Sequence, residues 1–148
     1  MAPLPPFQSD GDLPIGVHPG SLNDVLVRFG GGTPQRHVVG QRLERIRAIA
    51  VATGCLSRFI VFGSFITDEP YPNDVDIFMV MEDNFDVDNL VGDAELLFRD
   101  HLNADVQFGA SVFWLRRMAA IDGEQAAVEF WQIKLEGGQR GIVEIVRT

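Results

Sequence analysis

The sequence predicts an α/β (α+β) fold, in which a mixed β-sheet is flanked by helices. Segments with apolar residues at helical spacing alternate with short runs of β-branched and aromatic residues. The tail instead alternates apolar and polar residues, which is typical of a β-hairpin. Of the 148 residues, 46% are hydrophobic, enough for one core. We therefore expect a single domain over 21–148 and an irregular N-terminal arm over 1–20.

The first half of the chain predicts an arm followed by two helices. Residues 1–20 are rich in proline and glycine, so we expect no regular structure there. Ser21 can cap a helix over 22–29, which a run of three glycines ends. A longer helix over 34–53 has an apolar stripe and stops at Gly54.

The second half predicts alternating strands and helices. Residues 57–62 and 74–81 are apolar and β-branched, which indicates two buried strands. We expect a helix over 88–101, a short strand over 104–108 and a helix over 111–121 with Ser111 as its cap.

The tail predicts a hairpin of Glu129–Leu135 and Gly141–Val146, joined by a turn at 136–139. Trp131, Ile133 and Leu135 supply its alternating apolar side chains. Four large aromatic residues are expected in the core by default: Phe108, Phe113, Phe130 and Trp131.

Charge is unevenly distributed along the chain. Residues 59–110 carry one Arg against twelve acids, whereas the whole chain has a net charge of −9. Such a field attracts cations and disfavours bare nucleic acid phosphate. The single cysteine, Cys55, cannot form an internal disulfide, and neither a secretory leader nor 18 consecutive apolar residues is present. These features indicate a soluble, cytoplasmic protein with no membrane segment.

The candidate site residues for catalysis and metal binding lie mostly between residues 59 and 82. An apolar run ends in Gly63-Ser64, nine residues follow, and Asp74 and Asp76 then open a second apolar run. Side chains at i and i+2 of a strand share a face, so two carboxylates would lie roughly 7 Å apart along the backbone. Such a pair suits Mg²⁺ or Mn²⁺, which also binds substrate phosphates. Glycine lets the backbone approach a ligand closely, and the Ser64 hydroxyl can donate to phosphate.

A third acid would help to hold a second metal ion or to accept a proton. Asp105 is the best candidate, because an acid is otherwise unfavourable in the short apolar strand expected at 104–108. If that strand lies beside residues 74–81, Asp74, Asp76 and Asp105 can converge on the metal.

The pattern hydrophobic–Gly–Ser, nine residues, then Asp–hydrophobic–Asp resembles the signature of the nucleotidyltransferase superfamily with the DNA polymerase β-like fold. The match covers Phe59 to Val80, with Asp105 as a looser fit. The resemblance implies that Gly63 and Ser64 bind a nucleoside triphosphate such as ATP. It also implies that Asp74, Asp76 and Asp105 are catalytic residues that hold two Mg²⁺ ions.

Most of the chain also resembles a family of short, uncharacterised bacterial nucleotidyltransferase-like proteins, through LPIGVHPGSLNDVLVRFGG, GSFITDEPYPNDVDIF and GGQRGIVEIV. One departure from related active families stands out. They often continue Gly-Ser-x-Ala-Arg-Gly, whereas Phe65-Ile66-Thr67-Asp68 follows here. A cation for the triphosphate must then come from elsewhere, with Arg58, Arg116 and Arg140 as candidates.

Three functional hypotheses follow. The first is a minimal Mg²⁺-dependent nucleotidyltransferase acting on a hydroxyl of a protein, an RNA or a small molecule, with a partner chain or a homo-oligomer completing the cleft. The second is a binding module that has lost triphosphate binding and acts through a partner, as in a toxin–antitoxin or defence pair; the missing Arg favours it. The third is a metal-dependent hydrolase using the same acids.

Overall fold

The computed structural model describes residues 2–146 and contains a five-stranded mixed sheet in the order β1-β5-β2-β3-β4. β5 is parallel to β1 and antiparallel to β2, β2 is antiparallel to β3, and β3 is parallel to β4. The strands are β1 (Val17–Gly20), β2 (Leu56–Phe62), β3 (Val75–Met81), β4 (Ala110–Arg116) and β5 (Ile142–Ile145).

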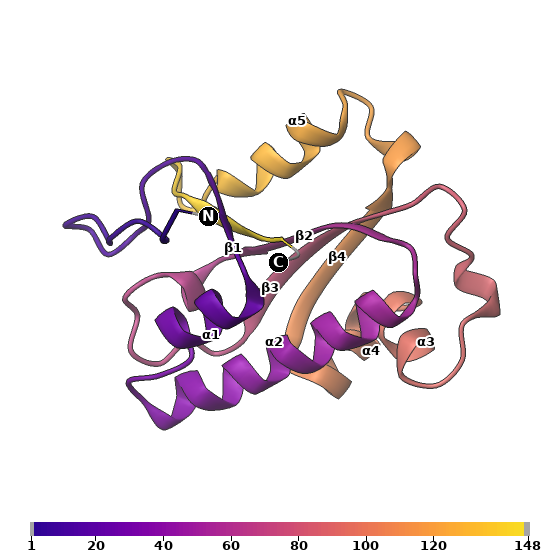
Figure 1. Ribbon diagram of the computed structural model, residues 1–148, viewed down its shortest axis with the longest axis horizontal. Coiled ribbons are helices and arrows are strands. Elements are labelled where there is room, and N and C mark those ends of the chain that lie inside the picture. The colour runs from indigo at the N-terminus through magenta and orange to yellow at the C-terminus, as the bar shows by residue number, and fades with distance from the viewer. Residues whose placement is uncertain (1, 147–148) are drawn as a thin grey trace.

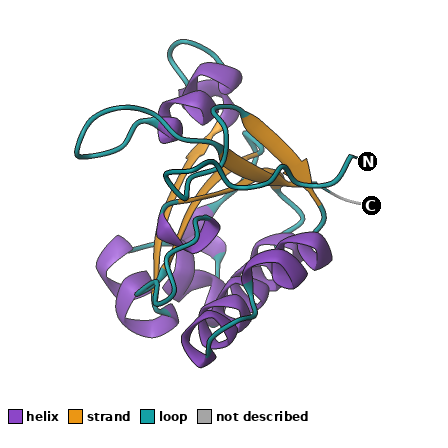
Figure 2. Ribbon diagram, turned by 90° about the vertical axis from the view of Figure 1, so that its left-hand side faces the viewer, coloured by secondary structure: helices purple, strands orange, loops and turns teal. Residues whose placement is uncertain are grey.

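The sheet separates two unequal helical layers (Figure 1). The helices are α1 (Leu22–Phe29), α2 (Pro34–Ala52), α3 (Asp93–Phe98), α4 (His101–Phe108) and α5 (Glu124–Glu129). Helices α1 to α4 cover one face and α5 lies over the other, as the view turned by 90° also shows (Figure 2). None of the helices in the described part of the chain combines the length and apolar character needed to cross a membrane.

The first two helices form as predicted. The Ser21 side chain accepts from the backbone N–H of Asp24, whose carboxylate accepts from the N–H of Ser21, so a capping box starts α1. Thr33 caps α2, and Gly54 follows its end with φ +73°. Strands β2 and β3 also lie within one residue of the ranges predicted for them.

Three predictions between residues 88 and 121 are wrong. The single helix over 88–101 is instead a 3₁₀ turn followed by α3 and α4, separated where Asp100 caps α4. The strand over 104–108 is part of α4, which Gly109 ends in the left-handed conformation. The helix over 111–121 is strand β4 followed by a 3₁₀ turn.

The predicted C-terminal hairpin is also wrong in its first strand. Residues of Glu129–Leu135 end α5 and form a 3₁₀ turn, and only an isolated bridge joins Ile133 to Gln139. β5 exists but pairs with β1 and β2. The arm over 1–20 is therefore not wholly irregular, because its last four residues form the edge strand β1, which pairs with β5.

The two faces of the sheet carry different side chains. Residues directly opposite in neighbouring strands share a face, which places Phe62, Asp76 and Ser111 together. The ring of Trp131, just after α5, packs on Phe62 and Phe78, so this face is the one under α5. Phe59 lies on the other face, under the guanidinium of Arg47 from α2. The Asp76 carboxyl therefore lies on the face with the thinner helical cover.

Candidate functional site

The acid pair lies where β2 ends and the neighbouring strands β3 and β4 begin. In the register Asp76 is opposite Phe62 on one side and Ser111 on the other. The Ser111 hydroxyl donates to Asp74 Oδ2 at 3.3 Å, and its polar interaction with Asp76 lowers the pKa of that carboxyl. Asp74 and Asp76 are both partly exposed, which leaves them open to a ligand.

Gly63 is required at the turn facing Asp76. Its φ of +83° is a conformation that L side chains rarely adopt. A Cβ placed on Gly63 would also lie 2.0 Å from Asp76 Oδ2, which is an impossible contact. The absent side chain is thus what lets the carboxylate lie against the Gly63-Ser64 turn. The structure thus brings the predicted turn and Asp76 into direct contact.

Burial raises the affinity of both carboxyls for protons. Burial, the charge of Asp74 and, less strongly, that of Asp105 raise the pKa of Asp76 to about 6. Burial also raises the pKa of Asp74, against the hydrogen bond from Ser111, with Asp105 adding to the rise. Holding both as anions at neutral pH therefore costs free energy that a bound cation would offset.

Asp105 is the predicted site residue that the structure places differently. It lies on the exposed side of α4 rather than in a strand beside β3. The charge of Asp105 still contributes to the raised pKa of Asp74 and of Asp76. Within residues 2–146, however, no group of three His, Cys, Asp or Glu side chains is arranged to hold a metal ion. The expected three-acid convergence is not met in this part of the chain, and Ser111 stands on β4 beside Asp76.

Cationic side chains reach the site from two directions. The charge of Arg42 on α2 acts on Asp74, and that of Arg140, just before β5, acts on Asp76; both lower the pKa of their carboxyl. Of the three arginines considered from sequence, Arg58 is bound by both oxygens of Glu144, at 2.9 and 2.6 Å. Arg116 donates to the carbonyl oxygen of Phe85. Arg140 lies 3.6 Å from Asp12, but it is the one of these three arginines whose charge also acts on the acid pair.

The loop between the Gly63-Ser64 turn and the acid pair is fixed by α2. The buried guanidinium of Arg36 donates to the carbonyl oxygens of Phe65 and Thr67, at 2.7 and 2.6 Å, and to those of Phe29 and Glu69. Thr33 and Gln35 of α2 donate to the carbonyls of Pro70 and Pro72, both at 2.8 Å. A loop with two prolines, which begins with the 3₁₀ turn Ser64–Ile66, is thereby held in one conformation.

Two functional residues were missed from sequence. Ser111 was interpreted as a helix cap, although the run of β-branched and aromatic residues after it is also a strand signal. Arg36 had no local signal, because an arginine on a helix is usually solvated and its carbonyl partners lie about 30 residues away.

The donor set suits a single hard cation. Two carboxylates and a hydroxyl at the end of a sheet match what Mg²⁺ accepts, provided that phosphate oxygens and water complete its shell. Asp74 and Asp76 would hold the ion. The elevated proton affinity of both carboxyls agrees with this, because a site built for a cation binds protons when none is bound.

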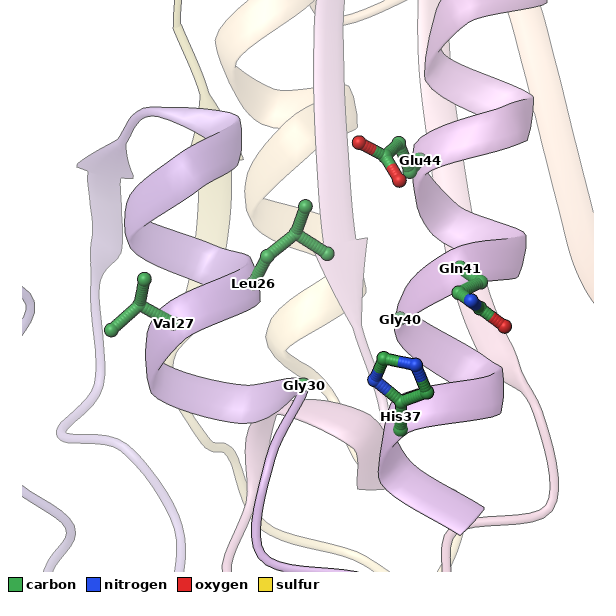
Figure 3. A pocket seen from close by; sticks show the side chains of 7 residues that line it. All are labelled: Leu26, Val27, Gly30, His37, Gly40, Gln41 and Glu44. Atoms are coloured by element: carbon green, nitrogen blue, oxygen red, sulfur yellow. The ribbon is translucent and has the colours of Figure 1, made fainter. Parts of the chain in front are cut away.

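A separate hollow of about 250 Å³ lies between α1 and α2 (Figure 3). Leu26 and Gly40 belong to its apolar part, and His37 and Glu44 project from α2 toward it. None of its lining residues belongs to the acid site. It therefore adds nothing to the chemistry of that site.

Fold and site together define a mixed α+β domain with a two-carboxylate centre against a glycine turn. The chain belongs to the family DUF6932, a family of unknown function, whose match spans residues 5–146. No curated protein and no solved structure matches the chain.

Proposed function

We propose that the protein is a minimal nucleotidyltransferase that moves a nucleotidyl group from a nucleoside triphosphate to a hydroxyl acceptor. The observation that carries the proposal is the contact of the Asp76 carboxylate with Gly63. It places an anion pair that favours a cation beside a turn whose backbone can approach phosphate. Together the two features match the needs of phosphoryl-type transfer, which are positioning and charge neutralisation.

Each residue then has a defined task. The Gly63-Ser64 turn binds the triphosphate through backbone N–H groups and the Ser64 hydroxyl. Asp74 and Asp76 hold Mg²⁺, which neutralises charge on the phosphates when bound. Arg140 supplies the positive charge that the sequence after Ser64 lacks. The acceptor oxygen bonds to the α-phosphorus, the bond to the bridging oxygen breaks, pyrophosphate leaves, and the hydroxyl proton passes to solvent.

Thermal unfolding tests the proposal directly. A ligand that binds only the folded state raises the midpoint by mass action. We expect Mg²⁺ or Mn²⁺ with a nucleoside triphosphate to raise it, and Asp76→Asn to abolish the rise. Transfer of a labelled nucleotide to a protein or RNA in lysate then identifies the acceptor. Binding without any labelled product would count against transferase activity.

The second candidate is a binding module that acts through a partner protein. The observation that favours it is the position of Asp105, which leaves two acids where the superfamily signature implies three. This candidate predicts no shift of the unfolding midpoint with any nucleotide. The same experiment therefore separates the two candidates.

A further inference from the structure

An aromatic row starts beside the acid pair and runs to the edge of the sheet. Phe62 lies opposite Asp76 in the β2–β3 register. The ring of Trp131 packs on Phe62 at 4.6 Å and on Phe113 at 5.0 Å, and His101 stacks on Phe113 at 4.6 Å. The planes of these neighbouring rings differ by 29° to 34°. The four rings therefore form a continuous row of tilted contacts that ends in the stacked pair of Phe113 and His101.

The outer end of this row is open to solvent, against the expectation that Phe113 is a core residue. Phe113 is 37% exposed and His101 is also exposed. The His101 ring is nevertheless fixed, because its Nδ1 lies 3.1 Å from the carbonyl oxygen of Val112 and donates to it. An exposed but immobilised pair of rings loses little conformational entropy when a flat ligand stacks on it.

The spacing of the strands relates this pair to the site. Gly63 ends β2, Asp76 is on β3, and Ser111 and Phe113 follow each other on the same face of β4. Neighbouring strands lie about 4.8 Å apart and each residue adds about 3.4 Å along a strand. Phe113 is two strands across from the Gly63 turn and three residues along β4 from its level, so about 14 Å separate them. An extended nucleoside triphosphate covers a similar distance from its terminal phosphate to its base.

We infer that His101 and Phe113 form the nucleobase subsite of the nucleotide substrate, an inference that rests on the proposed function. The triphosphate lies at Gly63-Ser64, the metal-bound phosphates over Asp74 and Asp76, and the base on the open end of the aromatic row. A nucleobase is favoured over a protein partner because the row is continuous with the acid pair through Phe62. Stacking accepts every base, so purine and pyrimidine triphosphates both bind.

Calorimetry with Mg²⁺ tests the subsite by comparing ATP and UTP with inorganic tripolyphosphate, which has no base. We expect wild type to bind both nucleotides more tightly than tripolyphosphate. His101→Ala should weaken nucleotide binding roughly tenfold, in the range found for loss of one base–aromatic contact. Phe113→Leu should weaken it as well, because it removes the ring on which His101 stacks. Both should leave tripolyphosphate binding unchanged. Because His101 is exposed, we expect His101→Ala to leave the fold intact. It therefore tests the subsite even if Phe113→Leu destabilises the fold.

Phe130→Leu is the matched control. Phe130 is 59% exposed and meets Trp131 edge-on, at 84°, so it is outside the stack. It should change neither affinity. The subsite is refuted if wild type binds tripolyphosphate as tightly as ATP, or if His101→Ala weakens both equally. If Asp76→Asn affects the binding of none of these ligands, the proposed function fails and the subsite fails with it.

Discussion

Replacing Asp76 by Asn should stabilise the protein while abolishing its response to metal ions. The pKa of Asp76 rises from 3.8 to about 6 in the folded state. Each unit corresponds to about 1.4 kcal/mol, so the anion costs the folded state roughly 3 kcal/mol at neutral pH. Asp76 is partly exposed, so solvent screening makes this figure an upper limit. Asn keeps the shape and can accept the Ser111 hydrogen bond without the charge.

The sign of the effect depends on pH. A carboxyl with a raised pKa destabilises the folded state fully above about pH 6, and the penalty fades as pH falls toward 3.8. The gap between the unfolding midpoints of Asp76→Asn and wild type should therefore be large at pH 7.5 and nearly absent at pH 4. For 148 residues a gain of 3 kcal/mol corresponds to a shift on the order of 10 °C.

Differential scanning calorimetry at both pH values measures this gap. Asp122→Asn, which removes an exposed acid before α5, controls for the loss of one negative charge. Added Mn²⁺ should raise the wild-type midpoint and leave that of Asp76→Asn unchanged, so it narrows the gap. An Asn variant that is no more stable than wild type at pH 7.5, or equally stabilised at pH 4, would refute the electrostatic reasoning.

Three further predictions concern the supports of the site. Gly63→Ala should lower the free energy of unfolding by several kcal/mol and abolish the metal-induced thermal shift, because its Cβ would meet Asp76. Gly54→Ala is the control, since Gly54 is also at positive φ but has nothing within 4 Å of the added Cβ. It should lower the free energy of unfolding, measured with denaturant, by only about 1 kcal/mol. Arg36→Lys should destabilise the protein by about 2–5 kcal/mol, because four carbonyl oxygens lose their guanidinium donor. Limited proteolysis should then cut the loop over 67–73. A loop that stays resistant would contradict the idea that Arg36 holds it in place. Asp105→Asn should retain most of the metal-induced thermal shift; complete loss would restore Asp105 as a ligand.

The contact between the glycine turn and the acid pair can be predicted from the sequence, because the residues that form it lie close together in the chain. Gly63, Ser64, Asp74 and Asp76 lie within fourteen residues, and the strands flanking them are apolar and β-branched. Once β2 and β3 pair, the acids must lie beside the turn. The first two helices are predicted for the same reason, since their caps and apolar stripes are encoded within each segment.

The segment over 88–121 was mispredicted where local signals conflict. Asp100 and Gly109 are good cap and stop residues for α4, but Ala104, Val106 and Phe108 alternate with polar residues, which also fits a short strand. A strand at 104–108 shifts the element expected next, so the sequence predicts a helix capped by Ser111 where the structure has β4. The tail failed for a different reason. β5 finds its partners in β1 and β2, which are distant in sequence and invisible to local periodicity.

The protein's other acids argue that the pair serves a ligand. Glu144 is half-buried and held by Arg58 at 2.6 Å, and the buried Asp12 lies 3.1 Å from Lys134. Structural acids in this fold are therefore neutralised by a cation of the chain. Among the described residues neither Asp74 nor Asp76 has such an ion pair, and burial raises the pKa of both. An arrangement that destabilises the empty fold but suits a divalent cation is what a binding site requires.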